Sequence, residues 1–247
     1  MRALRAADVV IVPVSTVPGG DVGAKGSGRA ESVVREHLGT DRVVRVPFVM
    51  SDRTGVTARR AEAWETAAQV VLDAFAEGAT TVAFATLGDP NVYSTFTYLA
   101  ATVRTRDPRV RVRTIPGITA MQDLAARSGT PLCEGREVLT LVPATAGPQT
   151  VEASLRRDGT VVVYKGSSGG AALMEVLART GRLDTAVVGA RLGMDGEHLA
   201  PASTWASDTG TGTDTGTEAC TDTEAAHVLR LPYLSTVLVP ADRRQRG

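Results

Sequence analysis

The chain has 247 residues, of which 43% are hydrophobic and 22% are charged, and its formal net charge is zero. This composition is that of an ordinary soluble globular protein with one large or two modest domains. The balanced charge argues against a nucleic acid partner, and no apolar run approaches the roughly 18 residues that cross a membrane.

The first elements alternate between helix and strand. Residues 1–7 have the character of a helix end and residues 8–14 that of a strand, so we expect a segment to precede Met1. A glycine-rich loop at 15–29 lacks the glycine and lysine order of a phosphate-binding loop. A helix is expected at 30–38 and a strand at 42–47. A helix at 57–76 has apolar residues at helical spacing, which predicts a core position for Trp64.

The stretch 81–100, "TVAFATLGDPNVYSTFTYLA", predicts a strand, a tight turn and a helix. Gly88 allows close backbone approach, Asp89 can cap a helix, and Pro90 suits the first helical position. Asp89 is either an N-cap alone or a cap whose neighbouring amides face a ligand. In an open α/β sheet such a turn lies at the carboxyl end of a strand, where ligands bind.

A second unit of this kind follows. We expect a strand at 110–114, a turn at Pro116 and Gly117, and a helix that opens near Thr119 and ends at Gly129. Two such turns from neighbouring strands form the walls of one crevice. Together they favour a nucleotide-like site.

The pattern changes near residue 131, which predicts two α/β domains at 1–131 and 132–247. The second half predicts strands at 137–141, 160–164, 185–191, 227–231 and 235–239, with helices at 149–156 and 171–179. So few helices among the later strands predict a mixed sheet. The tract at about 204–226, rich in Thr, Asp, Gly and Ala, predicts a disordered insertion.

Several catalytic patterns are missing from the sequence. There is no G-x-G-x-x-G after a strand, no G-x-S-x-G, no H-E-x-x-H and no C-x-x-C. The two cysteines, Cys133 and Cys220, form no metal spacing, so no metal site is indicated and a reducing cytoplasm is expected. A site without an evident nucleophile, metal or base suits a cofactor that carries the chemistry itself.

The segments "TLGDPNVYSTFTYL", "IPGITAMQ" and "VVYKGSS" resemble the tetrapyrrole (uroporphyrinogen-III/precorrin) methylase family. "VPFVMSDRTG" and "VVGARLGMDGE" are similar to the branch that methylates C-20 of precorrin-2 in cobalamin biosynthesis. The resemblance implies two α/β domains with a cleft between them, the first sheet mostly parallel. It also implies bound S-adenosylmethionine (SAM), a tetrapyrrole substrate and a homodimer.

By motif, the resemblance implies a set of cofactor-binding residues and leaves the catalytic residue unknown. The expected cofactor contacts are Leu87, Gly88, Asp89, Val92, Thr119, Ala120, Tyr164, Lys165 and Ala190. The Lys165 ammonium is expected to point away from the cofactor's sulfonium. Arg29, Arg53 and Tyr93 are candidate substrate contacts, and the two arginines would anchor substrate carboxylates.

The start of the chain departs from the family pattern. Relatives open with a strand and a G-x-G-P-G-D-P turn before the helix that begins here at Met1, so the first strand is expected to be missing. Three interpretations follow: an active C-20 methylase, a methylase acting at another ring position, or a truncated form that binds without catalysis.

Overall fold

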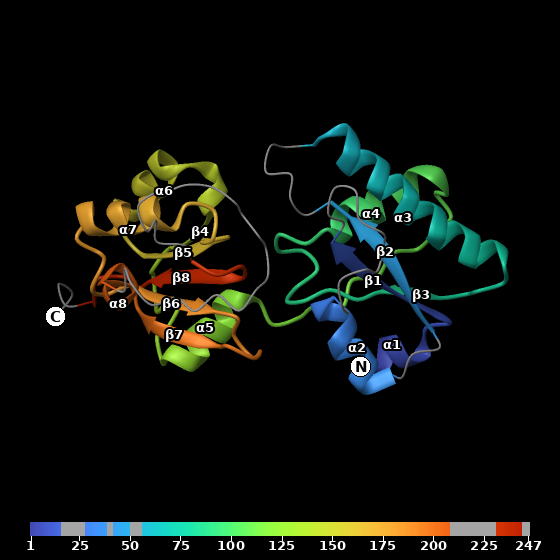
Figure 1. Ribbon diagram of the computed structural model, residues 1–247, viewed down its shortest axis with the longest axis horizontal. Coiled ribbons are helices and arrows are strands. Elements are labelled where there is room, and N and C mark those ends of the chain that lie inside the picture. Colours follow the sequence, from blue (N-terminus) through green and yellow to red (C-terminus); the bar gives the residue numbers. More distant parts are fainter. Residues whose placement is uncertain (16–27, 39–41, 50–55, 208–230, 244–247) are drawn as a thin grey trace, which may run out of the picture. The chain divides into compact units, whose positions relative to one another are not determined.

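The structure, a computed structural model, describes residues 1–15, 28–38, 42–49, 56–207 and 231–243 (Figure 1). The chain divides into two compact units, Met1–Thr119 (unit 1) and Ala120–Gly247 (unit 2). Each unit has its own sheet and hydrophobic core, which confirms the α/β class. A boundary between independently folding domains after residue 131 stays a prediction.

Unit 1 is built on a parallel sheet with the order β2-β1-β3. Its strands are β1 (Val9–Ser15), β2 (Val43–Phe48) and β3 (Val82–Phe84). Helices α1 (Arg2–Ala6) and α2 (Arg29–Leu38) cover one face, while α3 (Ala58–Ala76) and α4 (Phe96–Arg106) cover the other (Figure 1). The central strand is an almost continuous apolar run because both of its faces are covered.

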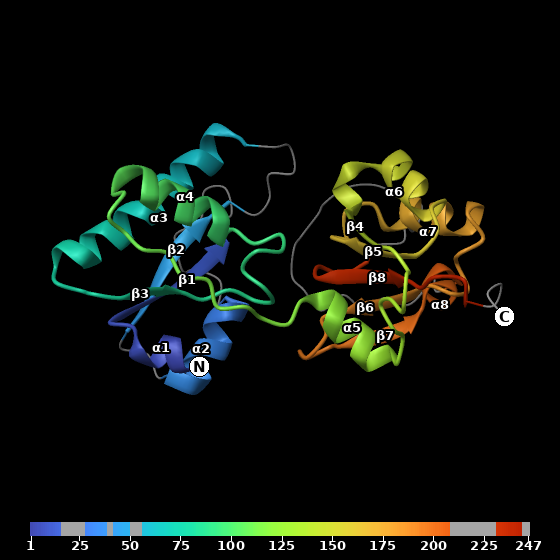
Figure 2. The ribbon, with the colours of Figure 1, turned by 180° about the vertical axis from the view of Figure 1, so that it is seen from behind.

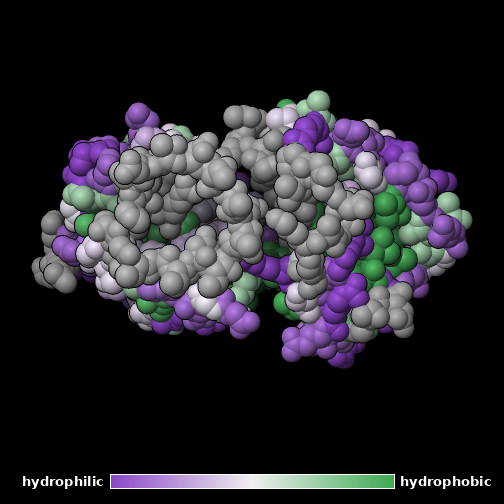
Figure 3. Space-filling model, in the orientation of Figure 1, coloured by the Kyte–Doolittle hydropathy of each residue, from purple (hydrophilic) through white to green (hydrophobic). Residues whose placement is uncertain are grey.

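The side chains of β1 alternate between two clusters. Ile11 packs with the cluster under α3 and α4, and Val10 and Val12 pack with residues of α1 and α2. On the outer strand β2, Val44 keeps 37% of its surface exposed. Figure 3 shows a hydrophobic area on this side of unit 1. The parallel sheet predicted for the first half is confirmed.

Helix α3 confirms the core position predicted for Trp64. The Thr57 hydroxyl accepts a hydrogen bond from the Arg60 N–H and caps the helix. Trp64 packs against the unit 1 core and stacks on Tyr98 of α4 with ring centroids 4.3 Å apart. The Arg60 guanidinium lies 5.4 Å from the Trp64 ring centroid, within cation–π range.

A buried carboxylate ties α2 to β2. The side chain of Glu31 is fully buried and accepts hydrogen bonds from Arg35, 2.6 Å away, and from Arg45, 2.9 Å away. Burial raises the pKa of Glu31, but the hydrogen bonds from the two arginines outweigh it, so the pKa lies below its usual value. The buried charge is therefore paired, as burial requires.

Unit 2 has a five-stranded mixed sheet with the order β4-β5-β8-β6-β7. The strands are β4 (Leu139–Pro143), β5 (Thr160–Tyr164), β6 (Val187–Ala190), β7 (His198–Pro201) and β8 (Ser235–Val239). Only β4 and β5 pair in parallel, and the other pairs are antiparallel. The predicted mixed sheet is therefore confirmed.

Helices cover both faces of this sheet. Helices α6 (Pro148–Leu155), α7 (Gly170–Arg179) and α8 (Ala202–Ser207) pack with one core cluster, and a short 3-10 turn, Ala144–Ala146, precedes α6. Helix α5 (Ala120–Ser128) packs against β8 (Figure 2). A Cβ built on Gly189 would lie 2.8 Å from Leu124 of α5, so α5 approaches the sheet closely there.

Three expectations change, and one strand was missed. Residues 110–114 form no strand, since they pair with none of the described strands and Arg111 to Arg113 are exposed. Helix α4 begins at Phe96, so the helix expected right after Pro90 starts later. Residues 204–207 belong to α8, where Trp205 packs on the core, so the low-complexity tract starts after them. Strand β7 was not predicted.

Other predicted features lie outside the described residues. These are the glycine-rich loop at 16–27, the tract at 208–226 and most of the strand expected at 227–231. Within the described chain, no helix combines the length and apolar character that crossing a membrane requires.

Candidate functional site

The loop between β3 and α4 is organised by the carboxylate of Asp89. One of its oxygens accepts a hydrogen bond from the Asn91 N–H at 2.8 Å, and the other accepts one from the Gly117 N–H at 3.0 Å. The N–H of Phe96, the first residue of α4, instead donates a hydrogen bond to the Ser94 hydroxyl. The prediction that Asp89 caps a helix is therefore wrong: it ties two turns together.

The two turns also meet through their backbones. A Cβ placed on Gly117 would lie only 2.2 Å from the carbonyl oxygen of Gly88, a distance that real Cβ atoms do not show. Gly88 has a φ of 70°, a conformation that glycine adopts without strain. The two turns therefore meet, although the second one follows a segment that belongs to none of the described strands, so the prediction of turns from two neighbouring strands is not met.

Charge and apolar surface gather on these turns. The hydrogen bonds from the Gly117 and Asn91 amides hold the pKa of Asp89 below its ordinary value of 3.8, so the side chain is ionised at neutral pH. Exposed apolar side chains surround it: Leu87 (37%), Tyr93 (45%), Ile115 (48%) and Ile118 (68%). Exposed apolar groups beside fixed polar groups are typical of ligand sites.

Unit 2 contributes a second group of candidate residues around Tyr164. This residue ends β5, and its hydroxyl accepts a hydrogen bond of 2.9 Å from the Met121 N–H in the first turn of α5. Ala120 is the first residue of that helix, and Thr119 before it is buried. The bond connects the carboxyl end of β5 with the start of α5, so Ala120 and Tyr164 lie near each other.

Lys165 and Ala190 lie on either side of the start of β8. The Gly166 N–H donates to the Ser235 carbonyl at 3.1 Å, and Ala190 pairs with Ser235 in the sheet. Strands β5 and β6 both run antiparallel to β8, so their carboxyl ends lie at one edge of the sheet. Lys165 is exposed and has a φ of 57°, while Ala190 is buried.

The remaining candidates are dispersed or lie outside the description. Val92 is half-buried, and its N–H donates to the Asp89 carbonyl. Tyr93 has a φ of 50° in the same loop. Arg29 is exposed at the start of α2, and Arg53 lies outside the described residues.

Sequence reasoning did not single out Gly117 or Arg191 as site residues. Gly117 was read only as part of a turn, although a glycine facing an aspartate-containing turn is a signal for close backbone approach. Arg191 directly follows β6, one residue after the predicted contact Ala190. Its position after a strand was the signal available.

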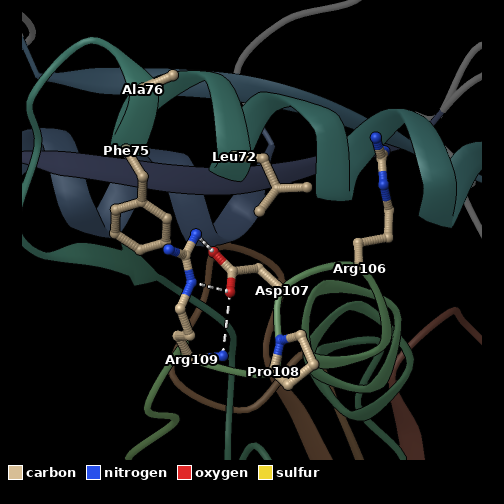
Figure 4. Close-up of a pocket in the computed structure, with 7 residues that line it drawn as sticks. All are labelled: Leu72, Phe75, Ala76, Arg106, Asp107, Pro108 and Arg109. Atoms are coloured by element: carbon tan, nitrogen blue, oxygen red, sulfur yellow. Dashed lines mark hydrogen bonds and ion pairs between the residues drawn. The ribbon is translucent and has the colours of Figure 1, made fainter.

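The concave feature drawn in Figure 4 contains none of these candidates. It lies between α3 and the residues after α4, and its lining includes Leu72, Phe75 and Arg106. There the carboxylate of Asp107 accepts two hydrogen bonds of 2.9 Å from the Arg109 guanidinium. Among the described residues, no group of three or more His, Cys, Asp or Glu side chains could hold a metal ion.

Two curated relatives cover most of the chain. A cobalt-precorrin-2 C(20)-methyltransferase from Salmonella typhimurium is 28% identical over 196 residues, which is 79% of this chain and 77% of the relative. A precorrin-2 C(20)-methyltransferase from Sinorhizobium is 30% identical over 172 residues, 67% of each chain.

Solved structures share the fold. A cobalamin-synthesis-related protein from Corynebacterium diphtheriae aligns with a TM-score of 0.61 at 17% identity, over 97% of this chain and 90% of that one. A uroporphyrin-III C-methyltransferase from Thermus thermophilus, complexed with S-adenosylhomocysteine, aligns with a TM-score of 0.57 at 18% identity, over 100% and 90% of the two chains. Residues 1–204 match the sequence profile described as Tetrapyrrole (Corrin/Porphyrin) Methylases. The chain therefore belongs to the tetrapyrrole methylase family.

Proposed function

We propose that this chain is a SAM-dependent methyltransferase that methylates C-20 of precorrin-2, metal-free or cobalt-containing, in cobalamin biosynthesis. Membership of the family and the likeness to two C(20)-methyltransferases support this reaction. Within the structure, the observation that carries the proposal is the tight contact between the Gly88–Asp89 turn and Gly117. A methylase acting at another ring position is not favoured by these relatives.

The residues of this contact fit a cofactor held mainly by backbone groups. Gly88 and Gly117 have no side chains, and the Asp89 carboxylate accepts hydrogen bonds from two backbone amides. The neighbouring Leu87 and Ile118 expose apolar surface, which suits the flat faces of an adenosine. We propose that Leu87, Gly88, Asp89 and Val92 hold the cofactor, together with Thr119, Ala120, Tyr164, Lys165 and Ala190.

When bound, SAM supplies an electrophilic methyl group. The chain's own contribution is then to orient the acceptor carbon and to exclude water, since alignment alone can supply a large part of a rate enhancement. The rigid Asp89–Gly117 contact serves this role because it fixes the loop against movement.

The substrate carries many carboxylates, and guanidinium groups bind carboxylates in pairs of hydrogen bonds. We propose Arg29 and Arg53 as substrate contacts on this chemical ground, and Tyr93 as a further substrate contact in the loop that contains Asp89. We also propose a homodimer, which the family resemblance implies, and a location in a reducing cytoplasm, for which the cysteine content is the argument.

The test is a methyl-transfer assay with the position of the methyl group as its readout. The full chain is incubated with precorrin-2 and SAM labelled with ¹³C in the methyl group, and the product is examined by NMR. We expect one new methyl signal, attached to C-20. A signal at another ring carbon would replace the proposed position, and no transfer with either metal-free or cobalt-containing substrate would refute the activity.

A pair of variants separates a specific reaction from background methylation. Gly117→Ala disturbs the loop contact, whereas Gly129→Ala lies at the end of α5, where a Cβ would meet nothing within 4 Å. Transfer should be lost in the first variant and kept in the second. Equal transfer by both would show that the contact has no part in the reaction.

A further inference from the structure

The edge of the unit 2 sheet at the start of β8 is conformationally strained. We call it the β8 edge and define it by Lys165, Arg191, Leu234 and Ser235. Four described non-glycine residues have a positive φ, and three of them are at this edge: Lys165 (57°), Arg191 (52°) and Leu234 (66°). Such conformations cost about 1 kcal/mol or more each and gather at ligand-binding sites.

Hydrogen bonds hold this edge in place. The Gly166 N–H donates to the Ser235 carbonyl, and the Ser235 hydroxyl donates to the Pro232 carbonyl at 2.6 Å. A Cβ on Gly166 would fit only tightly, because it would lie 3.2 Å from Leu231 Cδ1 and 3.4 Å from the Ser235 carbonyl oxygen. These contacts connect the segments that carry Lys165 and Leu234 to the start of β8.

Arg191 has a cationic group without a counterion in the described part of the chain. Its Nε atom is buried and has no hydrogen-bond partner there, and no described carboxylate forms an ion pair with it. The side chain lies over the turn that follows β6, since its Nη1 would be 3.2 Å from a Cβ on Gly196. A buried N–H of a charged group is costly to leave unbonded.

This turn carries two acidic residues: Asp195 is exposed and forms no ion pair with Arg191, and Glu197 is already engaged. The carboxylate of Glu197 accepts hydrogen bonds of 2.9 Å from Arg127 and one of 2.6 Å from the Gly193 N–H. Arg127 also pairs with Asp123 at 2.9 Å. Arg127 thus pairs with two carboxylates. Arg191, on the same turn as Glu197, pairs with none of the described carboxylates and keeps its positive charge.

From these observations we infer that Arg191, flanked by Lys165 across the start of β8, binds a carboxylate group of a ligand at the methylation site. This inference rests on the proposed function, in which both the tetrapyrrole and the amino-acid part of the cofactor carry carboxylates. A guanidinium binds a carboxylate through two parallel hydrogen bonds. The cofactor's sulfonium is excluded as the occupant because its charge is also positive.

The experiment compares the wild-type chain with Arg191→Gln, Arg191→Lys and a matched control, Arg157→Gln. Arg157 is exposed after α6 and before β5 begins, at the opposite edge of the sheet, so its replacement removes the same charge elsewhere. Uroporphyrin III, an octacarboxylate, is titrated by fluorescence. S-adenosylhomocysteine and 5′-methylthioadenosine, which lacks the carboxylate, are titrated by calorimetry.

We expect Arg191→Gln to weaken uroporphyrin III binding about 10- to 100-fold, the loss typical of a charge-assisted hydrogen bond, with S-adenosylhomocysteine binding unchanged. A loss for S-adenosylhomocysteine but not for 5′-methylthioadenosine would place the cofactor's carboxylate at Arg191 and would also support the inference. Arg191→Lys keeps the charge but cannot form the two parallel hydrogen bonds of a guanidinium, so it should weaken binding by a smaller factor than Arg191→Gln.

Two outcomes count against the inference and differ in what they overturn. If Arg191→Gln binds both ligands as tightly as Arg157→Gln, the carboxylate site is wrong while the proposed function stands. If the wild-type chain binds neither ligand, the proposed function fails and the inference fails with it. Thermal unfolding of each variant checks folding, and Arg191→Lys decides the matter if Arg191→Gln does not fold.

Discussion

Replacing Gly117 by alanine tests the central contact of unit 1 with the smallest possible change. The added Cβ would lie 2.2 Å from the Gly88 carbonyl oxygen, so the two turns must separate by at least about 0.8 Å to reach the 3.0 Å limit of real contacts. The atom it meets is backbone, which cannot rotate away as a side chain would. The same movement stretches the hydrogen bond of 3.0 Å from the Gly117 N–H to Asp89.

Overpacking of this kind costs about 1 to 3 kcal/mol, and the strained hydrogen bond adds to that cost. We therefore expect Gly117→Ala to lower the free energy of unfolding in urea by about that amount. If the cofactor is bound at the loop, its affinity should fall by a factor of about 10 or more, because each 1.4 kcal/mol is tenfold. Calorimetric titration with S-adenosylhomocysteine measures the second effect.

Gly129→Ala is the control for the change of residue type. Gly129 has a φ of 64° and a Cβ there would meet nothing within 4 Å, so only the conformational cost of about 1 kcal/mol applies. Cofactor affinity should be unchanged in this control. The reasoning is refuted if Gly117→Ala unfolds and binds like the wild type, since the two turns would then have room that the structure denies them.

Three further substitutions test charges and hydrogen bonds. Because the pKa of Asp89 lies below its ordinary value of 3.8, its charge stabilises the fold above that pH and this contribution is lost as pH falls through the folded-state pKa. In a series of urea melts, the free energy of unfolding of Asp89→Asn should therefore fall less below about pH 4 than that of the wild type. An equal fall in both proteins would contradict this. Tyr164→Phe removes the acceptor of the Met121 N–H and should cost about 1 kcal/mol in urea unfolding, and a variant as stable as wild type would show that water replaces the hydroxyl. Glu31→Gln leaves two arginines without their buried partner and should cost about 2 kcal/mol, whereas Glu65→Gln, in an exposed ion pair, should change little; equal effects would refute the reasoning.

The sequence by itself determined most of the elements, because hydrophobic periodicity is a local signal. The apolar run of β1 and the helical face that contains Trp64 both follow from burial, and the structure confirms them. The mixed sheet of unit 2 was also predicted, since few helices lie between its later strands. The motifs around Gly88 and Thr119 indicated the family, and the comparisons confirm it.

Only the tertiary structure decided which groups meet. The partner of Asp89 is Gly117, 28 residues away, and the pairing depends on how two turns pack. The sequence predicted a helix cap for Asp89, because an aspartate beside a turn gives the same local pattern whether it caps a helix or bonds to a distant turn. Residues 110–114 alternate like a strand yet pair with no described strand, since a strand exists only when a neighbour supplies its hydrogen bonds.

The same limit applies to Arg191. Its charge is visible in the sequence, but the sequence does not show that Glu197, on the same turn, pairs with Arg127, which precedes it by 70 positions. Helical and strand patterns are set by neighbours within a few positions, whereas charge pairing and close backbone contact are set by residues that folding brings together. The elements could therefore be predicted from the sequence. The pairing of Asp89 could not, nor could the absence of an ion pair between Arg191 and any described carboxylate.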